Sequence, residues 1–137
     1  MGRKKYAAEI LEWTINQGIE VALVCTDSQF PNSPTAQKAG SLGIPVVSIE
    51  EAENYINKHP DEIDLVVSYL YWKKITKTFI DEPRYGCINF HPAILPEWRG
   101  TAGYNIAILN KLSEWGATAH YVDENIAVSY THLRAHE

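Results

Sequence analysis

Residues 44–70, IPVVSIEEAENYINKHPDEIDLVVSYL, place a short apolar run on each side of an amphipathic segment. The runs 44–49 and 65–70 are nearly all apolar, as expected for strands that are covered on both faces. Residues 50–59 are predicted to form a helix that ends before Pro60, because the residue before a proline disfavours helical backbone. A strand, a helix and a second strand joined by short loops predict a parallel strand–helix–strand unit.

The same alternation continues in both directions from this unit. Further strands are predicted at 21–25, 87–90 and 117–122, and further helices at 7–17, 35–42, 75–80 and 102–111. The chain is therefore predicted to adopt an α/β fold with a doubly wound, Rossmann-like and mostly parallel sheet. Ligands bind such sheets at the carboxyl ends of the strands, which here are residues 26–28, 68–72, 89–99 and 122–125.

Composition excludes several classes of protein. The chain has 137 residues, 45% of them hydrophobic, and a net charge of −5, which argues against disorder and against broad binding to a phosphate backbone. No apolar run is long enough to span a bilayer and no export signal is visible, so we expect a soluble, cytoplasmic protein without a membrane partner. Cys25 and Cys87 each lie in an apolar run and are expected to be buried thiols. We predict no metal site, because His132 and His136 lack acidic or cysteine partners nearby.

Asn89 and His91 are two residues apart at the end of a predicted strand, so their side chains should share one face. Pro92 and Pro96 stiffen the loop that follows. An amide donor and an imidazole on one face can hold a developing oxyanion, and an imidazole can exchange a proton near neutral pH. An Asn-x-His pair on a strand is also compatible with ordinary structure, so its spacing alone leaves both interpretations open.

The wider segment 88–100, INFHPAILPEWRG, is followed by a predicted helix and then by 118–124, TAHYVDE. This order closely resembles the catalytic domain of the folate-dependent formyltransferases over residues 3–126. The family includes glycinamide ribonucleotide, methionyl-tRNA and sugar-nucleotide N-formyltransferases. The resemblance implies transfer of a formyl group from 10-formyltetrahydrofolate to a primary amine. Asn89 would donate a hydrogen bond to the oxygen of the tetrahedral intermediate, and His91 would stabilise the same charge and move protons.

The resemblance also implies where the folate binds. In the family the pocket is built by the turn after the central strand and by the loop that precedes a catalytic Asp. A pteridine ring needs apolar walls and backbone hydrogen bonds, so the backbone of these segments is the expected contact, and their aromatic rings are equally compatible with packing. The expected cofactor-binding residues are Ser68, Tyr69, Leu70, Tyr71, Val122, Asp123, Glu124 and Asn125.

The two ends of the sequence depart from the family pattern. The family's catalytic Asp is expected at position 127, where this chain has Ala127; Asp123 belongs to the cofactor loop and is not assigned that role. Residues 128–137, VSYTHLRAHE, match one reading frame of a transposon-end adapter used in sequencing libraries. We therefore expect residues 1–126 to be a partial formyltransferase catalytic domain and 127–137 a non-native junction and tail. Because residues 1–5 lead directly into a helix, the sheet is expected to lack its first strand, and the chain as written to fold poorly with little or no activity.

The amine acceptor should be selected by the loop and helix after Gly100. Residues 101–107, TAGYNIA, look most like the sugar-nucleotide type, so an amino-sugar nucleotide is the expected acceptor. Three alternatives stay open. The chain could be the catalytic domain of a methionyl-tRNA formyltransferase, which would need a further carboxyl-terminal domain to use tRNA. It could be one half of a fusion enzyme that acts on a nucleoside sugar, or an α/β ligand-binding module without catalysis. The oligomeric state is not indicated.

Overall fold

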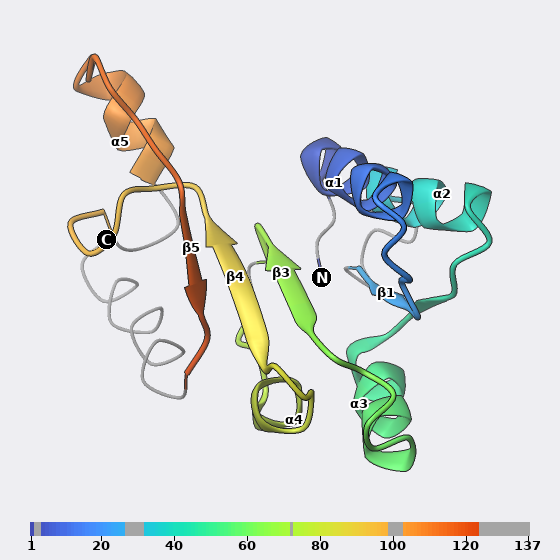
Figure 1. Ribbon diagram of the computed structural model, residues 1–137. Coiled ribbons are helices and arrows are strands. Elements are labelled where there is room, and N and C mark those ends of the chain that lie inside the picture. Colours follow the sequence, from blue (N-terminus) through green and yellow to red (C-terminus); the bar gives the residue numbers. More distant parts are fainter. Residues whose placement is uncertain (2–3, 27–31, 72, 99–102, 124–137) are drawn as a thin grey trace.

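A computed structural model describes residues 1, 4–26, 32–71, 73–98 and 103–123 of the chain. Helices and strands alternate along it in the predicted order (Figure 1). The elements are α1 (Lys5–Asn16), β1 (Val24–Cys25), α2 (Pro34–Ser41), β2 (Val46–Val47), α3 (Ile49–Lys58), β3 (Val66–Tyr69), α4 (Lys77–Asp81), β4 (Cys87–His91), α5 (Gly103–Leu109) and β5 (Thr118–Tyr121). The predicted α/β class is confirmed.

The strands form two separate ladders. In the first, β1 pairs with β2 in parallel, and in the second the order is β3-β4-β5. β3 runs parallel to β4, whereas β5 runs antiparallel to it, with His91 opposite Thr118 and Ile88 opposite Tyr121. Parallel pairing therefore predominates, as predicted, and one antiparallel strand closes the described part of the second sheet.

β1 and β2 are much shorter than the apolar runs that contain them. Of residues 21–25 only Val24 and Cys25 pair, and of 44–49 only Val46 and Val47 do. The apolar pattern therefore identified the strands correctly but overestimated their length.

Local capping explains where two of the helices begin. Ser33 precedes Pro34, and its side chain accepts a hydrogen bond from the Ala36 amide at 3.3 Å. Ser48 and Glu51 form a reciprocal capping box at the start of α3, because each side chain bonds the other residue's backbone amide. These contacts satisfy amides that a helix start leaves without partners.

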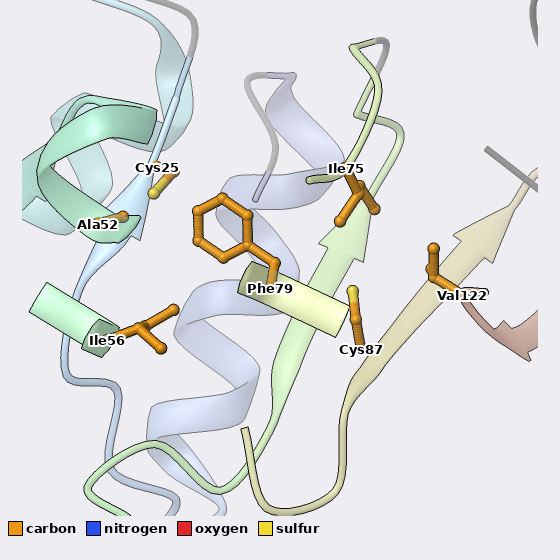
Figure 2. Close-up of a cluster of buried hydrophobic side chains, with 7 residues drawn as sticks. All are labelled: Cys25, Ala52, Ile56, Ile75, Phe79, Cys87 and Val122. Carbon is orange, nitrogen blue, oxygen red and sulfur yellow. The ribbon is translucent and has the colours of Figure 1, made fainter. Parts of the chain in front are cut away.

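The core consists of two clusters on opposite sides of β1. Val24 packs with Leu11 of α1 and Ala39 of α2, whereas Cys25 packs toward α3 and α4. Figure 2 shows the second cluster, with Phe79 between the side chains of the first sheet and those of the second. Its buried members are Cys25, Ala52, Ile56, Ile75, Phe79, Cys87 and Val122.

Both cysteines are buried and free, as predicted. Burial raises the pKa of Cys25 to about 11 and the pKa of Cys87 to about 11, so neither is a thiolate near neutral pH. In the part of the chain that the structure describes, no helix is both long and apolar enough to cross a bilayer.

Candidate active site

β4 presents Asn89 and His91 on one face. Buried and more exposed residues alternate along the strand, and Asn89 and His91 are 7% and 5% exposed whereas Phe90 between them is 38% exposed. Cys87 lies on the same face, in the core cluster of Figure 2. The two side chains therefore meet the expectation of a shared face at the carboxyl end of the strand.

His91 is held by the loop that follows it. Its Nε2 lies 3.1 Å from the carbonyl oxygen of Trp98, and a carbonyl can only accept, so Nε2 carries the proton. Burial lowers the pKa of His91, the nearby His120 lowers it further, and the bond to Trp98 opposes both. His91 is consequently neutral at pH 7, with Nδ1 as its unprotonated nitrogen.

Asn89 is oriented by His120 on the neighbouring strand. Nδ1 of His120 lies 2.9 Å from the carbonyl oxygen of Tyr121, so in the neutral ring Nδ1 donates and Nε2 accepts. Nδ2 of Asn89 lies 3.3 Å from that Nε2 and donates to it. One amide hydrogen of Asn89 therefore bonds His120. This bond fixes the rotation of the amide, and the second amide hydrogen points away from His120.

Two side chains, those of Trp115 and Thr118, brace the loop between β4 and Trp98. The indole Nε1 of Trp115 donates to the carbonyl of Pro92 at 2.9 Å. Thr118 Oγ1 donates to the Ala93 carbonyl at 2.8 Å and accepts from the Leu95 amide at 3.1 Å. The Trp115 ring also packs edge-on against Trp98, with ring centroids 5.5 Å apart. Because Trp98 supplies the partner of His91, these contacts hold the imidazole as well as the loop.

Ser68 is the residue of β3 that lies opposite Asn89, so Ser68, Asn89 and His120 form one row across the second sheet. Its side chain is fully buried, and no hydrogen-bond partner for its Oγ lies among the described residues. A buried hydroxyl without a partner costs about 1–3 kcal/mol, and a polar group on a ligand would remove that cost.

The next three predicted cofactor residues differ in their surroundings. Tyr69 turns to the other face of β3, where its ring lies 6.0 Å from that of Phe90. Leu70 adopts a left-handed backbone with φ of 52°, which ends the strand in a sharp turn. Tyr71 packs against the core cluster. Leu70 therefore shapes the turn after β3, and the rings of Tyr69 and Tyr71 pack within the protein.

Val122 and Asp123 lie at the opposite end of β4 from His91. Because β5 is antiparallel to β4, the chain leaves β5 beside Cys87, and the Val122 amide donates to the Cys87 carbonyl at 2.8 Å. The expectation that all four strand ends meet at one edge is therefore wrong for these two residues. Val122 still packs on the face that carries Asn89, whereas Asp123 is exposed. Glu124, Asn125 and residues 127–137 lie outside the described part of the chain.

Sequence reasoning missed the residues that support the site. His120, Thr118 and Trp115 had no predicted roles, yet they contact Asn89 and the loop after β4. Each contact joins residues at least 23 positions apart. Only the register of β4 with β5 brings these residues together, and no local pattern carries that register.

Comparisons with known proteins agree with this geometry. The family model described as "Formyl transferase" matches residues 1–127. A methionyl-tRNA formyltransferase of Agathobacter rectalis is 35% identical over 92% of the chain, and one of a Geobacillus species is 33% identical over 92%. A solved phosphoribosylglycinamide formyltransferase from Bacillus halodurans superposes on 90% of the chain with a TM-score of 0.73 and 26% identity, covering 70% of that protein. A sugar N-formyltransferase from a Shewanella species shares the fold, with a TM-score of 0.59 and 24% identity over 88% of this chain and 48% of that one.

The chain spans less than half the length of these curated relatives, 44% of the first and 43% of the second. The family match nevertheless covers nearly all of the present chain, including β4 and the residues that hold Asn89 and His91. The chain therefore belongs to the formyl transferase family.

Proposed function

We propose that this site transfers a formyl group from 10-formyltetrahydrofolate to a primary amine. The observation that carries the proposal is the pairing of Asn89 and His91 on the buried face of β4, with the amide oriented by His120 and the imidazole by Trp98. Membership of the formyl transferase family supports the same reaction. A solved formyltetrahydrofolate deformylase among the structures of the same fold is consistent with a formyl-folate donor.

The two side chains suit different parts of the reaction. When the amine attacks the formyl carbon, negative charge develops on the formyl oxygen, and the second amide hydrogen of Asn89 can bind it. His91 is neutral, so its Nδ1 can accept the proton that the attacking amine loses and return it to the departing nitrogen. Because both groups are oriented before substrate binds, little reorganisation is needed in the transition state.

The face around Asn89 offers one candidate polar contact for the folate donor. Cys87 lies two residues before Asn89, so their side chains are about 7 Å apart along the strand. Val122 and Ile75 belong to the same apolar cluster as Cys87. These three side chains are buried in the core, whereas the Ser68 hydroxyl, in the same row as Asn89, has no hydrogen-bond partner among the described residues and could bond a polar group of the donor.

Two amine acceptors are candidates. The sequence 101–107 favours an amino-sugar nucleotide; residues 101–102 lie outside the described part of the chain. The curated relatives are methionyl-tRNA formyltransferases at 29–35% identity, which favours the amino group of methionyl-tRNA. Both are primary amines, so the chemistry at Asn89 and His91 is the same and the acceptor depends on contacts made outside this pair.

Donor binding is the first test. Addition of 10-formyltetrahydrofolate should raise the thermal midpoint of the chain, because a ligand that binds only the folded state stabilises it. Replacement of Ser68 by Val should weaken this shift, and Ser41→Val, at the end of α2, should leave it unchanged. The absence of any shift with a wild-type chain that unfolds cooperatively contradicts the proposal.

Transfer is then measured in a single turnover with the chain in excess and a labelled formyl group. The amino-sugar nucleotide and the methionyl-tRNA are offered in separate reactions. Formylation of one acceptor identifies its class. Donor binding without transfer to either acceptor would instead support the non-catalytic ligand-binding module.

A further inference from the structure

The connection from β3 to α4 begins at the edge of the sheet that holds His91. β3 runs parallel to β4, with Ser68 opposite Asn89, so the chain leaves β3 beside the carboxyl end of β4. The structure describes this connection at residues 70–71 and 73–76. Its path therefore affects the part of the proposed site that lies next to the Ser68 hydroxyl.

Apolar contacts hold the connection against the core. Tyr71 packs against the core cluster, and Ile75 is 9% exposed within it. Figure 2 shows Ile75 and Phe79 in one cluster with Cys87, which lies on the same face of β4 as Asn89. The connection therefore passes from the edge of the sheet onto that face. Apolar burial has no preferred direction, so it does not by itself fix the path of the backbone.

A directional contact follows at Thr76. Its Oγ1 donates a hydrogen bond to Oε1 of Glu53, which lies in α3. The bond is partly buried and joins residues 23 positions apart. A hydrogen bond to a carboxylate is roughly twice as strong as one between neutral groups. Thr76 and Glu53 therefore attach the end of the connection to a helix of the neighbouring region.

Thr76 forms this bond in place of a local one. It is the N-cap residue of α4, where a threonine side chain commonly accepts a hydrogen bond from an amide of the first turn. Among the described residues the Thr76 side chain makes no such capping bond. The hydroxyl is therefore used to join α4 and the connection to α3, and not to stabilise its own helix.

α3 is a firm support for Glu53. Ala52 and Ile56 of the same helix are 0% and 4% exposed in the core cluster, and the capping box at Ser48 fixes the start of the helix. Connections between elements are more mobile than packed helices. Glu53 is therefore the fixed partner of the bond, and Thr76 is the partner that is held.

We propose that Glu53 is a positioning residue for the folate donor, because through Thr76 it holds the connection between β3 and α4 in the path that donor binding requires. This inference rests on the proposed function. Glu53 acts through Thr76 and is assigned no contact with the donor. Without the bond, the connection leaves this path in a larger fraction of molecules, and the apparent donor affinity falls in proportion. The chemistry at Asn89 and His91 is unchanged once the donor is bound.

The first measurement follows the connection itself by limited proteolysis. Lys73 and Lys74 are exposed within it, so trypsin can cleave after them when the connection opens. In Glu53→Leu this cleavage should accelerate by about tenfold or more, relative to cleavage after Lys58 at the end of α3. Cleavage after Lys58 is the internal reference, because unfolding of α3 as a whole would accelerate both.

Three further variants separate the bond from a general loss of structure. Glu53→Gln keeps an oxygen that can accept from Thr76, so it should restore most of the protection. Glu50→Leu, at an exposed position of the same helix, is the matched control and should leave the cleavage ratio unchanged. Thr76→Val removes the hydroxyl with little change of shape, so it completes the test if Glu53→Leu does not fold. The double variant should open no more than either single variant, because both residues act through one bond.

The second measurement is single-turnover formyl transfer at increasing concentrations of 10-formyltetrahydrofolate. In Glu53→Leu and in Thr76→Val, the donor concentration that gives the half-maximal rate should rise by about threefold or more. The rate at saturating donor should stay within about twofold of that of the unmodified chain. A purely structural role of the bond would lower the thermal midpoint without this separation of the two quantities.

Equal cleavage ratios for Glu53→Leu and Glu50→Leu would overturn the proposal. Faster cleavage with an unchanged half-maximal donor concentration would also overturn it, because the bond would then hold the connection without serving the donor. Loss of formyl transfer in the unmodified chain would contradict the proposed function and, with it, the role of Glu53 in donor binding. Failure of that role alone would appear in a chain that still transfers formyl groups.

Discussion

The sheet β3-β4-β5 and the pair β1-β2 differ in how many residues their strands pair. Both are built from short apolar runs, yet β4 pairs over four residues with each of its neighbours and β1 pairs with β2 over two. β4 has a strand on each side, whereas β1 pairs only with β2 among the described strands. The difference teaches that apolar runs of similar length pair over different numbers of residues, because the extent of pairing depends on the neighbouring strand and its register.

The residues of the candidate site belong to only one of these two regions. The candidate site lies entirely on the second sheet and its braced loop, where His120 and Trp98 orient the two side chains that the proposed reaction uses. The region around β1 and β2 supplies the helices that cover these strands, together with half of the core. Loosening the first pair should therefore reduce stability before it changes the geometry at Asn89.

Phe79→Ala should cause the largest loss of stability, because the Phe79 side chain packs between the two regions and is 2% exposed. Truncation of a buried aromatic ring costs about 3–5 kcal/mol, which should uncouple the two regions or unfold the chain. Urea unfolding followed by fluorescence measures the loss. Phe90→Ala, at a 38% exposed position, is the control and should cost far less. Similar losses for both variants would show that Phe79 does not join the regions.

Asn89→Ala should remove the proposed oxyanion donor from the sheet β3-β4-β5. We expect formyl transfer in the single-turnover assay to fall by about 10²–10³, as for other oxyanion donors. Unfolding by urea should change much less, because His120 can bond water at its partly exposed position. A loss of activity that is fully explained by unfolding would contradict the catalytic assignment.

Trp115→Phe tests the brace behind His91. The variant keeps an aromatic ring against Trp98 but removes the Nε1 donor to Pro92, at a cost of about 1–2 kcal/mol. Transfer should fall with little change in donor affinity, because the loop positions His91. Trp13→Phe, at an exposed position of α1, should alter neither quantity. An equal effect of the two substitutions would show that the Trp115 contact does not position His91.

Ser48→Ala acts on the region of the shorter ladder, β1-β2. Loss of the capping box at α3 should reduce the unfolding free energy by about 1 kcal/mol and leave transfer per folded molecule unchanged. Ser41→Ala, whose hydroxyl bonds the carbonyl of Lys38 near the end of α2, is the matched control and should cost less. A change in transfer rate for Ser48→Ala would mean that the two regions are more tightly coupled than the structure indicates.

His91 gives the smallest expected effect, a dependence of stability on pH. Its folded-state pKa is lowered, chiefly by burial, so the unfolded chain binds the proton more readily. The contribution of His91 is present above the unfolded pKa of about 6.5 and is lost as pH falls below it. Urea unfolding at pH 8 and pH 5 should therefore differ less for His91→Gln than for the unmodified chain. An unchanged difference would show that His91 is not desolvated.

Much of the site was predictable because its two central residues are close in sequence. Asn89 and His91 share a face through the two-residue period of a strand, and that period is a local property of the backbone. The placement of Val122 was not predictable, because an apolar run has the same pattern in a parallel and in an antiparallel strand. β5 is antiparallel, and that orientation places Val122 and Asp123 away from the edge that was expected to hold them.

The sequence by itself determined the order of helices and strands, the burial of both cysteines, the shared face of Asn89 and His91, and the family through its Asn-x-His-Pro segment. These properties depend on neighbouring residues and on hydrophobic spacing. Tertiary structure alone decided that His120 orients Asn89, that Trp98 holds His91, and that β1 and β2 pair over only two residues. Each of these depends on strand register and on which edges find partners, and such contacts become favourable only when distant segments pack together.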